Sequence, residues 1–328
     1  MNNSAGKILD TLAAARIAMP DLFLNNNIIP KDRESANKIT YIGFSSSSNN
    51  DTSVKCYFRP DKDILRLEPF AQKDKVAVYD IVRIALSIGV EPFEYSIASL
   101  NGSSSSLRLL WRVPSKIRSN EANMSLLLRS IAELMGFPQV FSAAREISYK
   151  LKDILGVRLN PLYLIGGQLD SRGHFLKMKV DFDADIGEDV SLYDNKKSLI
   201  GFDILLNELV GAKSYYKWLI WKKYVCMLLK NGYYIHFWGS HFVDIGLTEV
   251  KLYLRKNEYP SKQDCELLER LMSECGCRAL YPVSHMADFF KAAGWGYYGF
   301  YIGLSSEDLI TMKTYFSSDG RGICLPRN

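Results

Sequence analysis

The sequence predicts an α+β protein in which five β-hairpins alternate with helices, and three observations predict it. A short strand pattern built around a lysine or arginine recurs five times along the 328 residues. Each copy follows a second strand-like run across a turn rich in Ser, Gly, Asn or Asp. The segments between the hairpins carry apolar residues at helical spacing. The repeating unit is therefore helix, hairpin, helix.

The recurring pattern is an apolar residue, a Lys or Arg, one further residue and often a Tyr. The five copies are Val54-Lys55-Cys56-Tyr57, Leu107-Arg108-Leu109-Leu110, Leu176-Lys177-Met178-Lys179, Val250-Lys251-Leu252-Tyr253 and Met312-Lys313-Thr314-Tyr315. Their partner strands are expected at 38–44, 93–100, 162–169, 233–243 and 297–304. Alternation and β-branched or aromatic residues support a strand at each place.

Helices are expected between the hairpins, at 73–89, 121–136, 141–156, 264–275 and 284–293. Residues 194–230 are the least defined part, because 212–217 resembles the strand pattern a sixth time. We favour helices there, since a hairpin at that point would leave about 16 residues on either side, too few for the other helical connections.

The alternation within each strand separates a basic and aromatic row from an apolar row. Lys55 and Tyr57 point to one side, whereas Val54 and Cys56 point to the other. The apolar row is expected to pack against the helices, so the Lys and Tyr row lies on the opposite face. If the sheet stays open, that face is a solvated basic surface. If the ten strands close into a barrel, the row converges on a lumen wide enough to hold ligands.

A closed lumen of this composition has a definite chemical consequence. Burying several cations without a partner costs several kcal/mol each, so the lumen would need a multiply charged anion such as a diphosphate. Interleaved tyrosines would donate hydrogen bonds to phosphate oxygens and present π faces to a carbocation. A diphosphate and a carbocation occur side by side in prenyl transfer, so the pattern favours that reaction.

Composition excludes several other classes of protein. A surplus of 41 Lys and Arg over 36 Asp and Glu is too small for a dedicated nucleic-acid binder. No apolar run is long enough for a membrane helix, because Lys222 and Lys223 interrupt the most apolar stretch. The six cysteines are too sparse for a disulfide framework, and the one close pair, Cys275 and Cys277, lacks the second pair that would complete a zinc site. The common nucleotide and metal motifs are absent. Without an apolar N-terminal run that would indicate a signal peptide, we expect a cytoplasmic protein with no membrane or nucleic-acid partner.

The order and number of these units resemble the ABBA-type aromatic prenyltransferases, across about residues 38–320. The resemblance also rests on Glu249-Val250-Lys251-Leu252-Tyr253-Leu254, followed by a helix from Asp264, and on the tyrosine-rich closing unit 296–316. It implies a ten-stranded antiparallel β-barrel surrounded by helices, built from five α-β-β-α repeats and called the PT barrel. By length the chain is similar to the smaller bacterial branch, with a single domain over 1–328 and an N-terminal helical segment at 1–37.

The resemblance implies transfer of a dimethylallyl or geranyl group from its diphosphate to an electron-rich aromatic acceptor, such as an indole or a phenol. Carried over by position, the diphosphate would be held by the basic residues Lys55, Arg108, Lys177, Lys251 and Lys313. The allyl cation would be shielded by tyrosines of the same strands, Tyr57, Tyr253 and Tyr315. Donor or acceptor would stack on aromatic residues of the first strands, Trp238, Tyr234 and Tyr297.

Two departures from the family pattern affect the expected site. Leu110 and Lys179 stand where other copies have Tyr, which leaves the aromatic shield incomplete. Several relatives place a glutamate base on the first strand of the first unit, and 38–44 contains none. Glu94 is the nearest candidate base, with a solvated carboxylate at a strand end as the alternative interpretation.

No cofactor is expected to be required, because cations replace magnesium in the family, although Mg²⁺ dependence stays open. The acidic group that includes Asp181 and Asp185 is interpreted as a strand end and solvated loop rather than a magnesium site. Two alternative functions also remain. One is a prenyltransferase that modifies Trp or Tyr side chains of cyclic peptides, and the other is a non-catalytic barrel whose outward basic groove binds anions or nucleic acid.

Overall fold

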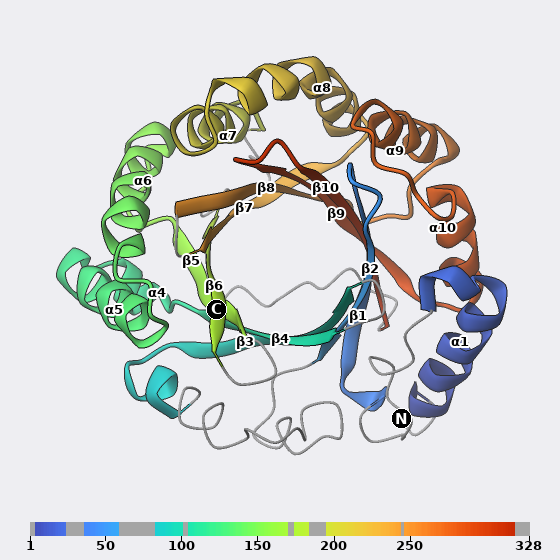
Figure 1. Cartoon of the computed structure of the whole chain (residues 1–328), viewed down its shortest axis with the longest axis horizontal. Helices are drawn as coiled ribbons and strands as arrows, with labels where there is room; N and C mark the ends of the chain where they lie inside the picture. The colour runs from blue at the N-terminus through green and yellow to red at the C-terminus, as the bar shows by residue number, and fades with distance from the viewer. Residues whose placement is uncertain are drawn as a thin grey trace.

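The computed structural model of the chain describes residues 4–23, 36–58, 83–100, 104–169, 174–183, 195–243 and 246–318. Ten antiparallel strands form one closed barrel, in which each strand pairs with its neighbours in the sequence (Figure 1). The first and last strands, β1 (Ile39–Ser47) and β10 (Ile310–Ser317), pair with each other and close the ring. The remaining strands are β2 (Thr52–Phe58), β3 (Glu91–Leu100), β4 (Ser104–Arg112), β5 (Leu162–Leu169), β6 (Phe175–Asp183), β7 (Tyr234–Val243), β8 (Gly246–Arg255) and β9 (Gly296–Ser305).

Helices surround the barrel on the outside, as Figure 1 shows. They are α1 (Ser4–Ala18), the 3₁₀ turn η1 (Pro20–Phe23), α4 (Ser115–Arg118), α5 (Glu121–Leu134), α6 (Val140–Leu155), α7 (Asn195–Leu209), α8 (Ala212–Lys230), α9 (Lys262–Glu274) and α10 (Val283–Ala292). The predicted PT barrel is confirmed. The open-sheet alternative is wrong, because β1 pairs on both of its edges.

Local sequence signals fix several of these helix ends. Helix α9 begins with a capping box, in which Ser261 accepts from the Asp264 N–H and Asp264 accepts from the Ser261 N–H. Helix α6 ends at Gly156, whose φ of 66° lies in the left-handed region that glycine adopts readily. The helices are therefore bounded where their sequence predicts.

The barrel wall has an apolar outer face and a polar, tyrosine-rich inner face. On β2, Val54, Cys56 and Phe58 are buried in the hydrophobic core that lies between the barrel and the helices. Lys55 and Tyr57 alternate with them and face the lumen. The side-chain rows predicted from strand alternation are thus confirmed for this hairpin.

Most helix positions agree with the sequence predictions. Residues 195–209 and 212–230 are the helices α7 and α8, so the strand alternative for 212–217 is wrong. Of the helix expected at 73–89, residues 83–87 are helical, and 73–82 lie outside the described residues. Within the described ranges, the helices are too short or too polar to cross a membrane.

Candidate active site

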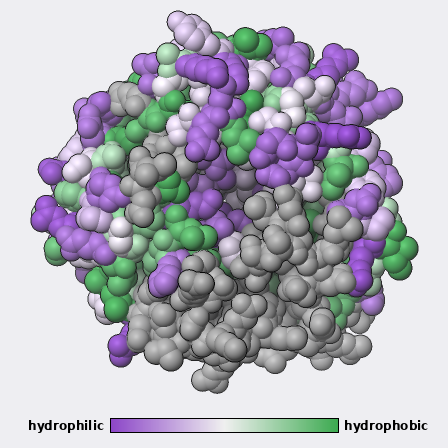
Figure 2. Space-filling view, viewed as in Figure 1, coloured by the Kyte–Doolittle hydropathy of each residue, from purple (hydrophilic) through white to green (hydrophobic). Residues whose placement is uncertain are grey.

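A polar cavity of about 370 Å³ occupies one end of the lumen. Four of the five predicted diphosphate ligands line it, namely Lys55, Lys177, Lys251 and Lys313. The strands of all five hairpins contribute to its wall, and the other lining residues are Ser45, Ser46, Ser47, Asp51, Thr52, Ser53, Ser106, Gln168, His241, Val243, Glu249, Tyr301, Ser305, Glu307, Leu309 and Thr311. In the view along the barrel, Figure 2 shows hydrophilic residues around a hollow near the centre of the face.

The four lysines differ in the partners that they have. Lys251 Nζ lies 3.0 Å from Glu249 Oε2 and donates to the Tyr301 hydroxyl at 3.2 Å. Lys313 Nζ donates to the Tyr57 hydroxyl at 3.4 Å. Within the described residues Lys55 and Lys177 make no hydrogen bond or ion pair. Three of the four amines therefore face the cavity without an acidic partner in the described chain.

Burial and mutual repulsion make these amines strong candidates for anion binding. The pKa of Lys55 is held well below its ordinary value of 10.5, first by burial and then by the charges of Arg108 and Lys313. Burial lowers the pKa of Lys177 and of Lys313 in the same way. Lys251 differs: burial also acts to lower its pKa, but Glu249 and Tyr301 together raise it above its ordinary value. An anion in the cavity would relieve the repulsion.

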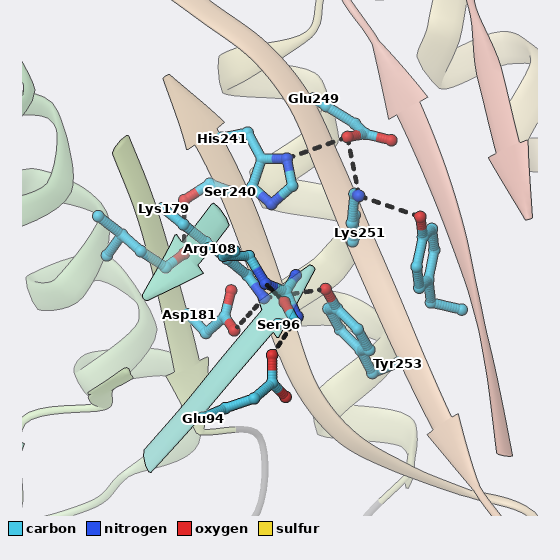
Figure 3. Close-up of polar contacts among 12 residues, drawn as sticks. Glu94, Ser96, Arg108, Lys179, Asp181, Ser240, His241, Glu249, Lys251 and Tyr253 are labelled. Carbon is cyan, nitrogen blue, oxygen red and sulfur yellow. Dashed lines mark hydrogen bonds and ion pairs between the residues drawn. The ribbon is translucent and has the colours of Figure 1, made fainter. Parts of the chain in front are cut away.

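The remaining predicted ligand, Arg108, lies at a deeper level of the lumen. It lines a smaller cavity of about 20 Å³ below the first, forms an ion pair with Glu94 and donates from Nε to Ser96 Oγ at 3.2 Å (Figure 3). Glu94 is only 5% exposed, so its interpretation as a solvated strand-end carboxylate is wrong. Arg108 and Glu94, the predicted diphosphate ligand and the predicted base, therefore both lie in the lumen, where they form an ion pair with each other.

A second buried ion pair lies beside the first. Lys179 Nζ is 2.9 Å from Asp181 Oδ2 and donates to the Tyr253 hydroxyl at 3.2 Å (Figure 3). Burial lowers the pKa of Lys179 to about 8, despite Asp181, and raises the pKa of Asp181 despite Lys179. Asp181 is completely buried, so its assignment to a solvated acidic group is wrong; Asp185 lies outside the described residues.

Tyrosines form an aromatic layer next to the lysines. Tyr57, Tyr253 and Tyr315, the three predicted shielding residues, gather in one buried cluster with Tyr41, Phe237, Tyr298 and Tyr301. The Tyr41 and Tyr57 rings stack at 4.3 Å, and the Lys251 amine lies 4.3 Å from the Tyr301 ring centre. Burial raises the pKa of Tyr57, Tyr253 and Tyr315, so they remain neutral hydrogen-bond donors.

The predicted stacking residues are not in this layer. Trp238 and Tyr297 are buried in the outer core between barrel and helices, so the lumen face expected for them is wrong. Tyr234 lies at the start of β7, where its hydroxyl donates to Asn257 Oδ1 at 3.3 Å. The pairing of β7 with β8 shifts between Ile235 and Phe237, and that of β9 with β10 shifts at Tyr298. These bulges reverse the alternation, and Phe237 and Tyr298 enter the lumen instead.

Several residues of the site were not predicted, and strand alternation contained the signal for two of them. Glu249 is two positions before Lys251 and therefore shares its face. Its carboxylate lies 3.1 Å from His241 Nδ1 and accepts a hydrogen bond from Thr311. Asp181 is similarly two positions after Lys179. The other residues, such as His241, depend on the register between strands that are far apart in the sequence.

Among the described residues, the site lacks the ligand set that a protein-held metal ion needs. No group of three or more His, Cys, Asp or Glu side chains that would hold one occurs among the described residues. Glu249, the acid next to the lysines, is already bonded to Lys251, His241 and Thr311. The outward basic groove of the non-catalytic alternative is also contradicted, because Lys251 and Lys313 are buried inside the barrel.

Comparisons with known proteins find the same fold. No protein-family model and no curated protein sequence matches the chain. The structure is similar to that of a 6-dimethylallyl tryptophan synthase, with a TM-score of 0.56 and 10% identity over 100% of this chain and 99% of the other. A 5-dimethylallyltryptophan synthase from Streptomyces coelicolor matches with a TM-score of 0.46 and 12% identity, covering 91% and 85% of the two chains. The prenyltransferase PriB, in a complex with L-tryptophan and dimethylallyl thiolodiphosphate, matches with a TM-score of 0.47 and 11% identity, covering 96% and 92%.

At such identities a structural likeness establishes the fold. The chain has the barrel of the ABBA-type aromatic prenyltransferases, as the sequence pattern indicates.

Proposed function

We propose that the protein is an aromatic prenyltransferase that transfers a dimethylallyl or geranyl group from its diphosphate to an indole or phenol. The observation that supports it best is the position of four lysines around one cavity, directly beside a layer of tyrosines. The first group is suited to a leaving diphosphate and the second to the carbon fragment. The same fold in a 6-dimethylallyl tryptophan synthase agrees with this proposal.

The diphosphate would bind among Lys55, Lys177, Lys251 and Lys313. The three amines without an acidic partner in the described chain provide the positive charge that a diphosphate neutralises. Arg108, at the deeper level, would stabilise the diphosphate through its positive charge and not through direct hydrogen bonds, because its guanidinium is already paired with Glu94. Glu249 would keep Lys251 protonated and in position between the strands.

The reaction starts when the bond between the allylic carbon and the diphosphate oxygen breaks and the electron pair leaves with the diphosphate. The lysines stabilise the negative charge that develops there, more strongly than they stabilise the bound donor. The faces of Tyr57, Tyr253 and Tyr315 stabilise the allyl cation and exclude water from it.

The acceptor ring then donates a π electron pair to the cation and forms a new carbon–carbon bond. The ring loses a proton from the substituted carbon and becomes aromatic again. We assign that proton to Glu94, whose side chain lines the deeper cavity together with Tyr57 and Tyr315. The products are the prenylated aromatic compound, the diphosphate and one proton.

The direct test is mass spectrometry after the protein is incubated with dimethylallyl or geranyl diphosphate and a panel of acceptors. The panel contains indoles, phenols and cyclic peptides with Trp or Tyr. We expect a product heavier than one acceptor by a single prenyl group, together with an equal amount of released diphosphate. A protein that binds pyrophosphate but prenylates none of these compounds would contradict the proposed reaction. Tight binding of single-stranded DNA with a steep salt dependence would instead support a nucleic-acid role.

A further inference from the structure

Helix α8 is apolar on both of its faces, although it lies on the outside of the barrel (Figure 1). The residues buried on its inner face include Trp218, Trp221, Val225 and Leu228. The outer face carries four large apolar side chains at helical spacing, between 43% and 67% exposed, which we call the α8 stripe: Tyr216, Leu219, Ile220 and Met227. A helix that is apolar all round is normally buried, so the outer face of α8 is suited to a partner.

The α8 stripe lies among positive charges. Helix α8 contains neither Asp nor Glu, and its five lysines are Lys213, Lys217, Lys222, Lys223 and Lys230. Three acids of other elements pair with four of them: Asp308 with Lys213 and Lys217, Asp203 with Lys222, and Glu274 with Lys223. Lys230 makes no ion pair with the described residues. Five lysines against three acids leave a surplus of two positive charges, and Lys223 lies within the stripe, about two turns after Tyr216.

The beginning of α8 adjoins the rim of the lysine cavity. Asp308, in the turn between β9 and β10, holds it there: its Oδ2 lies 2.6 Å from Lys213 Nζ, and its Oδ1 lies 2.6 Å from Lys217 Nζ. Glu307 and Leu309, on either side of Asp308, both line the cavity. A surface that contacts α8 would therefore lie beside this rim.

We propose that the α8 stripe docks the protein on an anionic lipid membrane. The apolar side chains enter the boundary between headgroups and acyl chains, and the lysines contact the acidic headgroups. A second copy of the chain is a poorer occupant, because a two-fold contact between α8 helices would bring their lysines together. A peptide would require a groove or a free strand edge, whereas a helix on the outside of a barrel presents a ridge.

Such docking requires no helix that crosses the bilayer. It differs from the sequence-based expectation of no membrane partner, which rested on the lack of an apolar run long enough to cross. If the proposed reaction is correct, docking also brings the cavity rim close to the lipid into which a prenylated product partitions. The docking itself does not depend on that reaction.

Co-sedimentation of the full chain with lipid vesicles tests the proposal without any substrate. Vesicles of phosphatidylcholine alone are compared with vesicles that also contain phosphatidylglycerol. We expect binding to the anionic vesicles that weakens as the salt concentration rises. Leu219→Ser with Ile220→Ser should lower the partition coefficient by about ten-fold or more, because two apolar side chains no longer enter the lipid. Lys223→Gln with Lys230→Gln should lower it by a similar factor, of about ten-fold or more, because two cations are lost.

The matched controls are Leu126→Ser and Lys150→Gln, which change an exposed leucine of α5 and an exposed lysine of α6. Both should bind vesicles as the wild type does, and all variants should unfold near the wild-type temperature because the changed side chains are exposed. A wild-type protein that ignores the anionic vesicles, or an equal loss of binding in the controls, would overturn the proposal. So would a dimer that Leu219→Ser with Ile220→Ser dissociates in the absence of vesicle binding, which would assign the stripe to a second copy. Binding of poly-glutamate but not of vesicles would assign it to an acidic protein instead.

Discussion

Lys313 and Tyr57 are separated by 256 residues in the sequence, yet the Lys313 amine donates to the Tyr57 hydroxyl at 3.4 Å. This contact joins the last hairpin to the first. The amine of Lys179 in the third hairpin reaches Tyr253 in the fourth in the same way, and Lys251 in the fourth reaches Tyr301 in the fifth. A lysine of one repeat is therefore positioned by a tyrosine of the next, around much of the ring.

Replacing a cavity lysine should remove most of the turnover. In Lys313→Met the stem remains and the charge that develops on the leaving diphosphate loses one of its cations. We expect kcat/KM to fall by about 10²–10³ while the melting temperature stays near that of the wild type. Steady-state release of diphosphate measures the first quantity, and thermal unfolding followed by circular dichroism measures the second.

The matched control for this variant is Lys152→Met, because Lys152 is a surface lysine paired with Glu121. Lys251→Ala should lower kcat/KM as Lys313→Met does, and should also leave Glu249 without its nearest cation. Normal kinetics in both Lys251→Ala and Lys313→Met would rule out the lysine cavity as the diphosphate site.

Aromatic rings, rather than hydroxyl groups, should be what protects the allyl cation. Tyr315→Phe keeps the ring and should retain most of the activity, whereas Tyr315→Leu removes the π face. We expect Tyr315→Leu to lower kcat by about ten-fold or more, since a desolvated cation–π contact is worth about 2 kcal/mol. The product mixture provides a second measurement, because water that reaches the cation yields the free prenyl alcohol. Equal activity in the Phe and Leu variants would show that the ring has no such role.

Strand alternation predicted the ring of lysines. Lys55, Lys251 and Lys313 each lie in a run without a break in register next to them, and the register shift at Leu176, beside Lys177, leaves Lys177 in the cavity wall. The same reasoning failed for Trp238 and Tyr297. Each lies beside a β-bulge, where one extra residue turns the next side chain to the other face. A bulge depends on how two strands pair, and no local feature of either strand predicts it.

The ion pairs inside the lumen could not be predicted from sequence patterns, for a related reason. The Glu94 and Arg108 pair spans β3 and β4, whose register also shifts between Pro92 and Glu94. The Lys179 and Asp181 pair lies on one strand, but its burial follows only from closure of the barrel. Single-strand reasoning therefore identifies which residues share a face, and closure determines which of them become buried and paired.

Breaking the Lys179 and Asp181 pair should destabilise the fold. Asp181→Asn removes the negative charge and leaves a buried amine without compensation, which costs roughly 3–5 kcal/mol when a buried ion pair loses one partner. Urea unfolding followed by tryptophan fluorescence measures this loss. The double variant Lys179→Met with Asp181→Asn should be more stable than Asp181→Asn alone, because no uncompensated charge remains. If the double variant were the less stable of the two, desolvation of Lys179 would not be the cause.

Binding of the diphosphate should take up protons at alkaline pH. In the free protein, burial and neighbouring cations lower the pKa of Lys55, Lys177 and Lys313 below the ordinary value of 10.5. A bound anion stabilises the protonated amines and raises their pKa again. Between the lowered and the restored pKa, binding therefore adds protons to the protein, and the affinity falls as the pH rises through that interval.

Titration calorimetry with dimethylallyl thiolodiphosphate in buffers of different ionisation enthalpy measures this uptake. At about pH 8.5 we expect the apparent binding enthalpy to depend on the buffer, with a slope that corresponds to protons entering the complex. Lys55→Met and Lys177→Met should each reduce the slope, because each removes one group that gains a proton, whereas Lys152→Met should leave it unchanged. A binding enthalpy that is the same in every buffer would mean that the lysines are already fully protonated in the free barrel, and the repulsion inferred among them would be wrong.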